Sequence, residues 1–198
     1  MNKIQVRRAV PADAPALHSL VAGLSPQTAF LRFFAGVGTP TARFVAALLR
    51  RYDTHGAWVC AAGDDLLGHA TWGRDGDAAE LGVVVADPWQ GLGIGRALLV
   101  ATLGEIADRG LTDVRLHVHA DNVRLARRLS RGAATAVLAD GVVTITRPVT
   151  DLLPTPSASP ARDISPVPHP SPARHPSPLI MHLWGSWSEP AQLVGRTA

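Results

Sequence analysis

The chain has 198 residues, which at about 150 residues per domain allows one domain with an extension and excludes a large multidomain protein. Apolar residues make up 46% and charged residues 18%, so a buried core can form and disorder of the whole chain is excluded. The formal net charge of +3 comes from 18 Arg and one Lys spread along the sequence, an excess too weak to indicate nucleic acid as a partner.

The sequence also bears on the cellular compartment. The single cysteine, Cys60, cannot form an internal disulfide, and the N-terminal residues lack the apolar run of a secretory signal. No uncharged apolar stretch reaches about 18 residues, so no membrane-spanning segment is predicted. We therefore expect a cytoplasmic protein that has no membrane partner.

The first part of the chain predicts one strand followed by short helices. Ile4, Val6 and Ala9 indicate a strand that ends at Pro11. Apolar residues at helical spacing follow, and Ser25-Pro26 is typical of a helix start, with a side-chain cap and a proline in the first turn. The expected helices cover residues 13–24, 25–34 and 41–51.

Three apolar runs joined by turn residues predict an antiparallel meander. They cover residues 56–62, 66–72 and 79–86. A helix at 92–109, which Gly110 ends, a strand at 112–120, a short helix at 121–131 and a last strand or hairpin at 136–145 follow. This order predicts an α+β fold, in which helices flank a mixed, mainly antiparallel sheet.

The distribution of proline divides the chain near residues 148–154. Residues 1–150 contain six prolines and residues 151–198 contain ten, with Ser-Pro repeated every six residues from Ser159. Proline at this density removes backbone donors and favours extended conformations. We expect a folded domain at 1–150 and a disordered Pro/Ser-rich tail at 151–198, where residues 179–187 are the one apolar patch.

A glycine-rich turn joins the third meander strand to the long helix. Gly91, Gly93 and Gly95 stand where the chain enters that helix. Helix N-termini expose unpaired N–H groups, and glycines let an anion approach them closely. Three glycines can also simply make a tight corner. A dinucleotide-binding GxGxxG does not fit this spacing, and a P-loop would need GK[ST].

This segment resembles the Q/R-x-x-G-x-G/A pyrophosphate loop of the GNAT acyltransferases, through Gln90, Gly93 and Gly95. The order of strands and helices is also that of GNAT proteins. Residues 25–36 and 79–99, with Asn122, resemble more narrowly the catalytic domain of bacterial Pat-type protein lysine acetyltransferases. The resemblance covers about residues 3–148 and implies acetyl-CoA as cosubstrate and no metal.

The resemblance also implies a mode of CoA binding. Backbone N–H groups of residues 90–96 would hold the pyrophosphate, and the strand edge at 81–85 would pair with the pantetheine amides. The thioester would lie where this strand and the strand at 112–120 splay apart. Asn122 matches an asparagine that many GNAT proteins use toward CoA, although a helix cap would explain it equally well. The implied cofactor-binding residues are Val83, Val85, Gln90, Gly91, Gly93, Ile94, Gly95, Arg96 and Asn122.

The resemblance assigns proton transfer to Glu80, the only acidic residue on its strand. An amine attacks a thioester only when neutral, and a lysine amine with a pKa of about 10.4 is mostly protonated at pH 7. A carboxylate, or a water that it orders, must take the proton. An exposed strand carboxylate is the alternative interpretation. His117 and His119 share a strand face and could line the same cleft, but alternating histidines are more often ordinary surface or packed residues.

Three functions remain open. The first is an N-acetyltransferase that moves the acetyl group of acetyl-CoA to a primary amine, with a protein lysine as one candidate acceptor. The second is a CoA-binding regulatory or sensor module without turnover, and the third is a scaffold whose tail binds partners. The helix after Asn122 has Leu129 near the position of a Tyr that many GNAT proteins use to protonate the thiolate. A thiolate can leave without such an acid because thiol pKa values lie near about 8.5. A monomer and a homodimer are both compatible with the sequence.

Overall fold

The computed structural model describes residues 3–34, 36, 38–132 and 135–153, and these form a helix-flanked mixed sheet of the predicted α+β class. The strands are β1 (Ile4–Arg8), β2 (His55–Ala62), β3 (Asp65–Asp75), β4 (Ala78–Val85), β5 (Asp113–His119), β6 (Thr135–Ala139) and β7 (Val142–Pro148). The helices are α1 (Ala14–Ala22), α2 (Pro26–Phe33), α3 (Ala42–Leu48), α4 (Ile94–Asp108), α5 (Val123–Ser130) and α6 (Val149–Leu152), with 3-10 turns η1 (Pro11–Asp13) and η2 (Asp87–Trp89).

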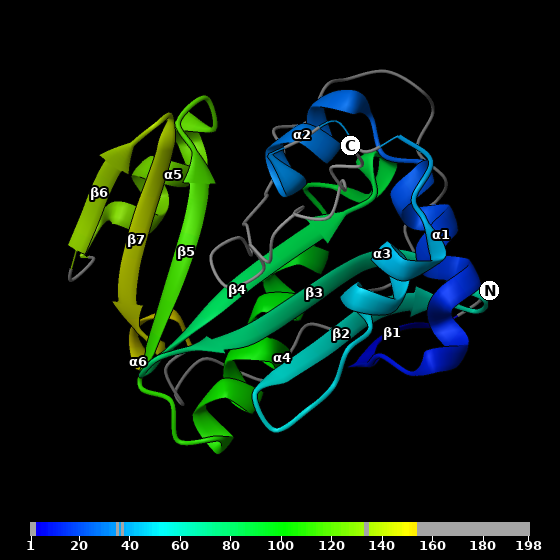
Figure 1. Ribbon diagram of the computed structural model, residues 1–198, viewed down its shortest axis with the longest axis horizontal. Helices are drawn as coiled ribbons and strands as arrows, with labels where there is room; N and C mark the ends of the chain where they lie inside the picture. The colour runs from blue at the N-terminus through cyan, green and yellow to red at the C-terminus, as the bar shows by residue number, and fades with distance from the viewer. Residues whose placement is uncertain (1–2, 35, 37, 133–134, 154–198) are drawn as a thin grey trace, which may run out of the picture.

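The sheet has two parts that meet at one end. Strands β1 to β4 form the predicted antiparallel meander, and β5, β7 and β6 form a second antiparallel group. β4 and β5 run parallel and pair only from Ala78–Asp113 to Glu80–Arg115. Beyond Glu80 the two strands diverge, as the resemblance implied, and Figure 1 shows the two groups of strands spreading apart from their common end beside α6.

Two apolar layers hold the sheet, one on each face, because successive strand residues point to opposite faces. On one face, Leu81 of β4 packs in a cluster with Leu98 of α4. On the other face, Val84 packs in a cluster with Leu17 of α1 and Val45 of α3. In Figure 1, α4 lies behind the sheet, whereas α1 and α3 lie in front of it. β4 is buried along its whole length as a result.

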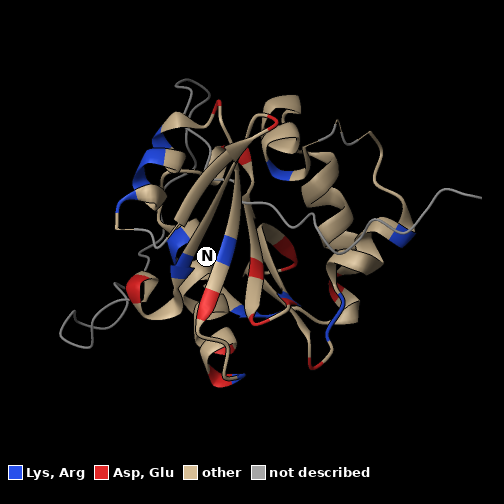
Figure 2. Ribbon diagram, turned by 60° about the vertical axis from the view of Figure 1, so that its left-hand side comes forward, with Lys and Arg blue, Asp and Glu red and all other residues tan. Residues whose placement is uncertain are grey.

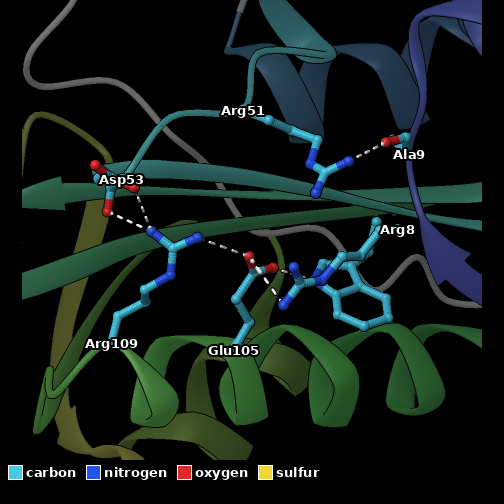
Figure 3. Close-up of polar contacts among 7 residues, drawn as sticks. Arg8, Ala9, Arg51, Asp53, Glu105 and Arg109 are labelled. Carbon is cyan, nitrogen blue, oxygen red and sulfur yellow. Dashed lines mark hydrogen bonds and ion pairs between the residues drawn. The ribbon is translucent and has the colours of Figure 1, made fainter.

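A buried carboxylate ties α4 to the first strands. Glu105 is 4% exposed, and its Oε2 accepts a 2.6 Å hydrogen bond from the Trp58 indole N–H. Arg8 and Arg109 approach its Oε1 at 3.5 and 3.6 Å, and Arg109 also donates to the Asp53 carbonyl (Figure 3). An apolar residue in place of Glu105, or in place of its partner Trp58, would leave a buried polar atom without its hydrogen-bond partner. These contacts fix the position of α4 beneath the sheet.

The last predicted element is a hairpin. β6 and β7 are joined through Asp140 and Gly141, both at positive φ, which is the two-residue turn that Asp-Gly favours. After β7, α6 packs against the core through Val149, which is 2% exposed.

The sequence predicts the Pro/Ser-rich tail at 151–198, but residues 151–153 belong to the end of α6 and its C-cap, and Leu152 and Leu153 pack against the core, so this part of the prediction is wrong. The rest of the predicted tail, 154–198, lies outside the described residues. Within the described ranges, every helix is too short or too polar to cross a membrane.

Charge is spread over the fold. In the view of Figure 2, acidic and basic positions are both distributed over the ribbon, with several basic positions close together on one helix at the left.

Candidate active site

The glycine-rich loop places an uncapped helix end beside open space. Gly93 is the N-cap of α4 and has a φ of 89°, and Gly91 has a φ of 77°. A Cβ built on either glycine would meet none of the described atoms within 4 Å. No side chain of the described residues caps α4, whose first backbone hydrogen bond joins Ala97 N–H to the Gly93 carbonyl. The N–H groups of this first turn can therefore receive an anion.

The other predicted cofactor-binding residues take different positions around this loop. Val83 and Val85 are buried in the part of β4 that no longer pairs with β5, so that only their backbone can serve a ligand there. Ile94 and Gly95 are buried in the first turn of α4, whereas Arg96 is exposed.

Gln90 and Asn122 lie at the same edge of the sheet. Because β4 and β5 are parallel, the segments that follow them emerge on one side. The Gln90 side chain donates a 3.1 Å hydrogen bond to the Val85 carbonyl, so it shapes the turn itself. Asn122 is 7% exposed at the start of α5, and its side chain makes no capping hydrogen bond to that helix. Asn122 thus stands at the N-cap position that the sequence suggested, but without the side-chain bond of a cap.

A hydrogen-bond network that the sequence did not reveal joins α2 to the same loop. Asp87 accepts hydrogen bonds from the Ser25 N–H at 2.9 Å, the Ser25 hydroxyl at 2.7 Å and the Thr28 hydroxyl at 2.6 Å. Burial by itself would raise the pKa of Asp87, but these hydrogen bonds outweigh it and hold the pKa below its ordinary value. The predicted cap is also present, since Ser25 Oγ accepts from the Thr28 N–H. The start of α2 is thereby fixed beside the end of β4.

Glu80 lies at the point where β4 and β5 separate. Its side chain is on the sheet face opposite α4, and the residue is 3% exposed, so the alternative interpretation as an exposed carboxylate is wrong. His117 Nε2 lies 3.1 Å from Glu80 Oε1. His117 Nδ1 lies 3.1 Å from the Thr144 hydroxyl on β7. The structure thus brings together the predicted base and one of the two histidines.

His119 occupies a separate place, nearer the open end of β5. Its ring centroid lies 4.9 Å from that of Phe30 on α2 and 5.7 Å from that of Phe34. Its Nδ1 lies 3.4 Å from an Asp121 oxygen. Phe30 is 37% exposed. The end of α2 and the end of β5 therefore meet through rings on the Glu80 face of the sheet.

A buried arginine covers β4 two residues beyond Glu80. Arg32 of α2 is 2% exposed and donates a 3.2 Å hydrogen bond to the Thr71 hydroxyl. A Cβ at Gly82 would stand 2.6 Å from Arg32 Nη2, so a glycine is needed for the guanidinium to lie on the strand. Burial lowers the pKa of Arg32 to about 10. No helical period or turn signal in the sequence pointed to this contact.

The single thiol does not belong to the site. Cys60 lies in β2 and is fully buried in the core, and burial raises the pKa of its thiol to about 11. A thiol that stays protonated is a poor nucleophile. Cys60 is therefore not a candidate for a catalytic nucleophile.

Comparison with known proteins gives the family. A family model described as the acetyltransferase (GNAT) family matches residues 28–132, more than half of the chain. The GNAT domain of S. lividans PAT is similar in structure, with a TM-score of 0.67 at 23% identity over 73% of this chain and 90% of that one. The ribosomal-protein-S18-alanine N-acetyltransferase of Escherichia coli has a TM-score of 0.54 at 19% identity, over 80% of this chain and 99% of that one.

A third similar structure was determined with coenzyme A bound. PaiA N-acetyltransferase from Thermoplasma acidophilum, in complex with coenzyme A, has a TM-score of 0.55 at 15% identity over 73% of this chain and 98% of that one. A comparison with curated proteins gave no match. The glycine-rich loop, the diverging strands and the family match agree with one another. The chain therefore belongs to the GNAT family and is an acyl-CoA-dependent N-acetyltransferase.

Proposed function

We propose that this protein transfers the acetyl group of acetyl-CoA to a primary amine and that Glu80 accepts the proton that the amine releases. The observation that carries the proposal is the burial of Glu80 at the end of the short β4–β5 ladder. The amine nitrogen attacks the thioester carbon, the carbon–sulfur bond breaks, and CoA leaves as a thiolate that takes a proton from water. The proton lost by nitrogen goes to Glu80.

The uncapped start of α4 supports a proposed site for the CoA pyrophosphate. Backbone N–H groups of residues 90–96 are the proposed donors, and the positive end of the α4 dipole favours the anion. The backbone of Val83 and Val85 would pair with pantetheine, since this part of β4 has no partner in β5. Asn122 is the proposed contact from the start of α5.

A protein lysine is the acceptor that we propose to test first. Phe30 and Phe34 meet His119 on the same face of the sheet as Glu80, and apolar rings suit the aliphatic stem of a lysine. The cytoplasm remains the proposed location, because a lone buried thiol fits a reducing compartment.

The central test is the substitution Glu80→Gln. Because Gln keeps the shape and cannot accept the proton, kcat should fall roughly 10²- to 10⁴-fold, while the Kd of acetyl-CoA stays nearly unchanged. Part of the rate should return as pH rises, since more of the amine is then already neutral. Stopped assays of acetylated lysine, together with calorimetry of acetyl-CoA binding, measure both quantities.

Glu105→Gln is the matched control, because it makes the same change at a second buried carboxylate on the opposite face of the sheet. Its kcat should stay within a few-fold of the wild type. If Glu80→Gln turns over at the wild-type rate, Glu80 is not the base. Binding of acetyl-CoA without transfer to any amine would instead support the regulatory module.

A further inference from the structure

We propose that His117 is a positioning residue for this reaction: its ring holds one oxygen of the Glu80 carboxylate and leaves the other oxygen for the amine. The inference rests on the proposed function, in which Glu80 is the base. It begins from the 3.1 Å contact between His117 Nε2 and Glu80 Oε1. A carboxylate that is 3% exposed needs a donor to offset the loss of water, and His117 supplies one.

The hydrogen-bond partners determine the tautomer of the ring. An ionised carboxylate can only accept, so the proton of a neutral His117 must be on Nε2. Nδ1 is then an acceptor, and the Thr144 hydroxyl, 3.1 Å away, donates to it. Both ring nitrogens are thereby satisfied. Because Nε2 already donates to Glu80, the ring has no free nitrogen with which to deprotonate an amine itself.

The strand register explains why these three side chains meet. Glu80 is paired with Arg115 in the last position of the β4–β5 ladder, and His117 lies two residues further on the same face of β5. Thr144 is directly opposite His117 in the β5–β7 ladder. The three side chains form one row across three strands, and His117 reaches Glu80 across the start of the divergence.

The kinetic test compares substitutions at His117. His117→Gln retains an N–H at about the reach of Nε2, whereas His117→Asn has one only at the reach of Nδ1. We expect kcat to fall roughly 10- to 100-fold in His117→Ala and His117→Asn, in the range that misplacement of a reacting group produces. His117→Gln should recover most of the rate. The Kd of acetyl-CoA should stay unchanged in all three variants.

Thr144 offers a matched pair of variants on one strand. Thr144→Val removes the donor to Nδ1 and should lower kcat a few-fold, whereas Thr146→Val, opposite Arg115, should leave kcat unchanged. Full turnover in His117→Ala would overturn the proposal. So would a His117→Gln variant that is folded, binds acetyl-CoA and is as slow as His117→Ala.

A spectroscopic test decides the arrangement without any turnover. In ¹⁵N-histidine-labelled protein, NMR should show His117 as the Nε2–H tautomer with a slowly exchanging proton, and Glu80→Ala should abolish that slow exchange. His69, whose Nε2 lies 3.0 Å from the Leu48 carbonyl, is the internal control and should keep its signal in both proteins. An Nδ1–H tautomer at His117, or a signal unaffected by Glu80→Ala, would overturn the positioning role. Absence of acetyl transfer to every amine would instead overturn the proposed function and leave this NMR result intact.

Discussion

At the scale of single residues, two buried basic side chains share the face of the sheet that carries Glu80. Arg32 and His69 are 2% and 1% exposed. Burial and, to a smaller extent, the charge of Arg32 lower the pKa of His69, and the Leu48 carbonyl and Asp13 act in the other direction; the net result is a pKa of about 3. With a pKa of about 10, Arg32 keeps its charge at neutral pH. At neutral pH Arg32 is therefore the charged member of this pair and His69 is neutral.

The low pKa of His69 predicts a loss of stability in mild acid. The unfolded chain binds a proton at His69 below about pH 6.5, whereas the folded chain does so only near pH 3. Between these values the unfolded state holds more protons, so the free energy of unfolding must fall as pH falls, by up to about 1.4 kcal/mol per pH unit.

His69→Gln should remove this contribution while keeping an N–H that can reach the Leu48 carbonyl. Urea unfolding at pH 7 and pH 5 measures the effect. The stability lost between the two pH values should be smaller in the variant by about 2 kcal/mol. Equal losses of stability between pH 7 and pH 5 in the wild type and in His69→Gln would show that His69 does not cause the pH dependence.

At the scale of elements, the Asp87 network links the start of α2 to the turn that leads into α4. Ser25 and Thr28 belong to the N-terminus of α2, and Asp87 belongs to η2. Gln90, in the same turn, lies 3.4 Å from the Thr28 hydroxyl. The helix that carries Phe30 and Arg32 is therefore positioned by the segment that forms the proposed pyrophosphate site.

Substitutions at Gly93 test the role of the α4 N-terminus. All non-glycine residues share the strain of a φ of 89°, so Ala, Lys and Glu variants should lose similar stability, about 1 kcal/mol each. Only Gly93→Glu adds a negative charge at the helix start, and we expect it to bind acetyl-CoA at least about tenfold more weakly than Gly93→Ala, or about 1.4 kcal/mol. Calorimetry gives the three dissociation constants. Equal affinity in the Ala and Glu variants would place the pyrophosphate elsewhere.

At the scale of the whole molecule, the core is shared between the two groups of strands. Leu81 of β4, Val114 and Leu116 of β5 and Ile145 of β7 are fully buried in one cluster with Ile106 of α4. This common layer holds the groups together even though β4 and β5 pair over a short length. The two strands can therefore diverge beyond Glu80 without loss of the core.

Truncation tests the extent of this unit. Among the described residues, both apolar clusters lie between Ile4 and Leu153. A chain that ends at Leu153 should therefore keep its free energy of unfolding and its affinity for acetyl-CoA within about 0.5 kcal/mol. A chain that ends at Pro148 also loses Val149, which is 2% exposed, and should be less stable by about 2 kcal/mol. Urea unfolding of the full chain and the two truncated chains measures the free energies of unfolding, and calorimetry measures the affinity for acetyl-CoA. A large loss of stability in the chain that ends at Leu153 would mean that residues after 153 belong to the folded unit.

The sequence by itself determined the elements and the glycine-rich loop, because these depend on local properties. Apolar spacing separates helices from strands, and Ser25, Gly110 and Gly93 act within a few residues of their own positions. The Asp140-Gly141 pair also favours a hairpin over a single strand at 136–145.

Only the tertiary structure decided which side chains meet at the site. Glu80 and His117 are 37 residues apart, and Ser25 and Asp87 are 62 residues apart. Their contacts depend on β5 lying parallel to β4 and on α2 crossing the end of β4, and no short stretch of sequence encodes either arrangement. Gly82 is a similar case. A side chain at this position would collide with Arg32, which reaches the strand from a different element. The periodicity of apolar residues shows which face of a helix or strand is buried. It does not show which residues of other elements pack against that face, and these residues form the site.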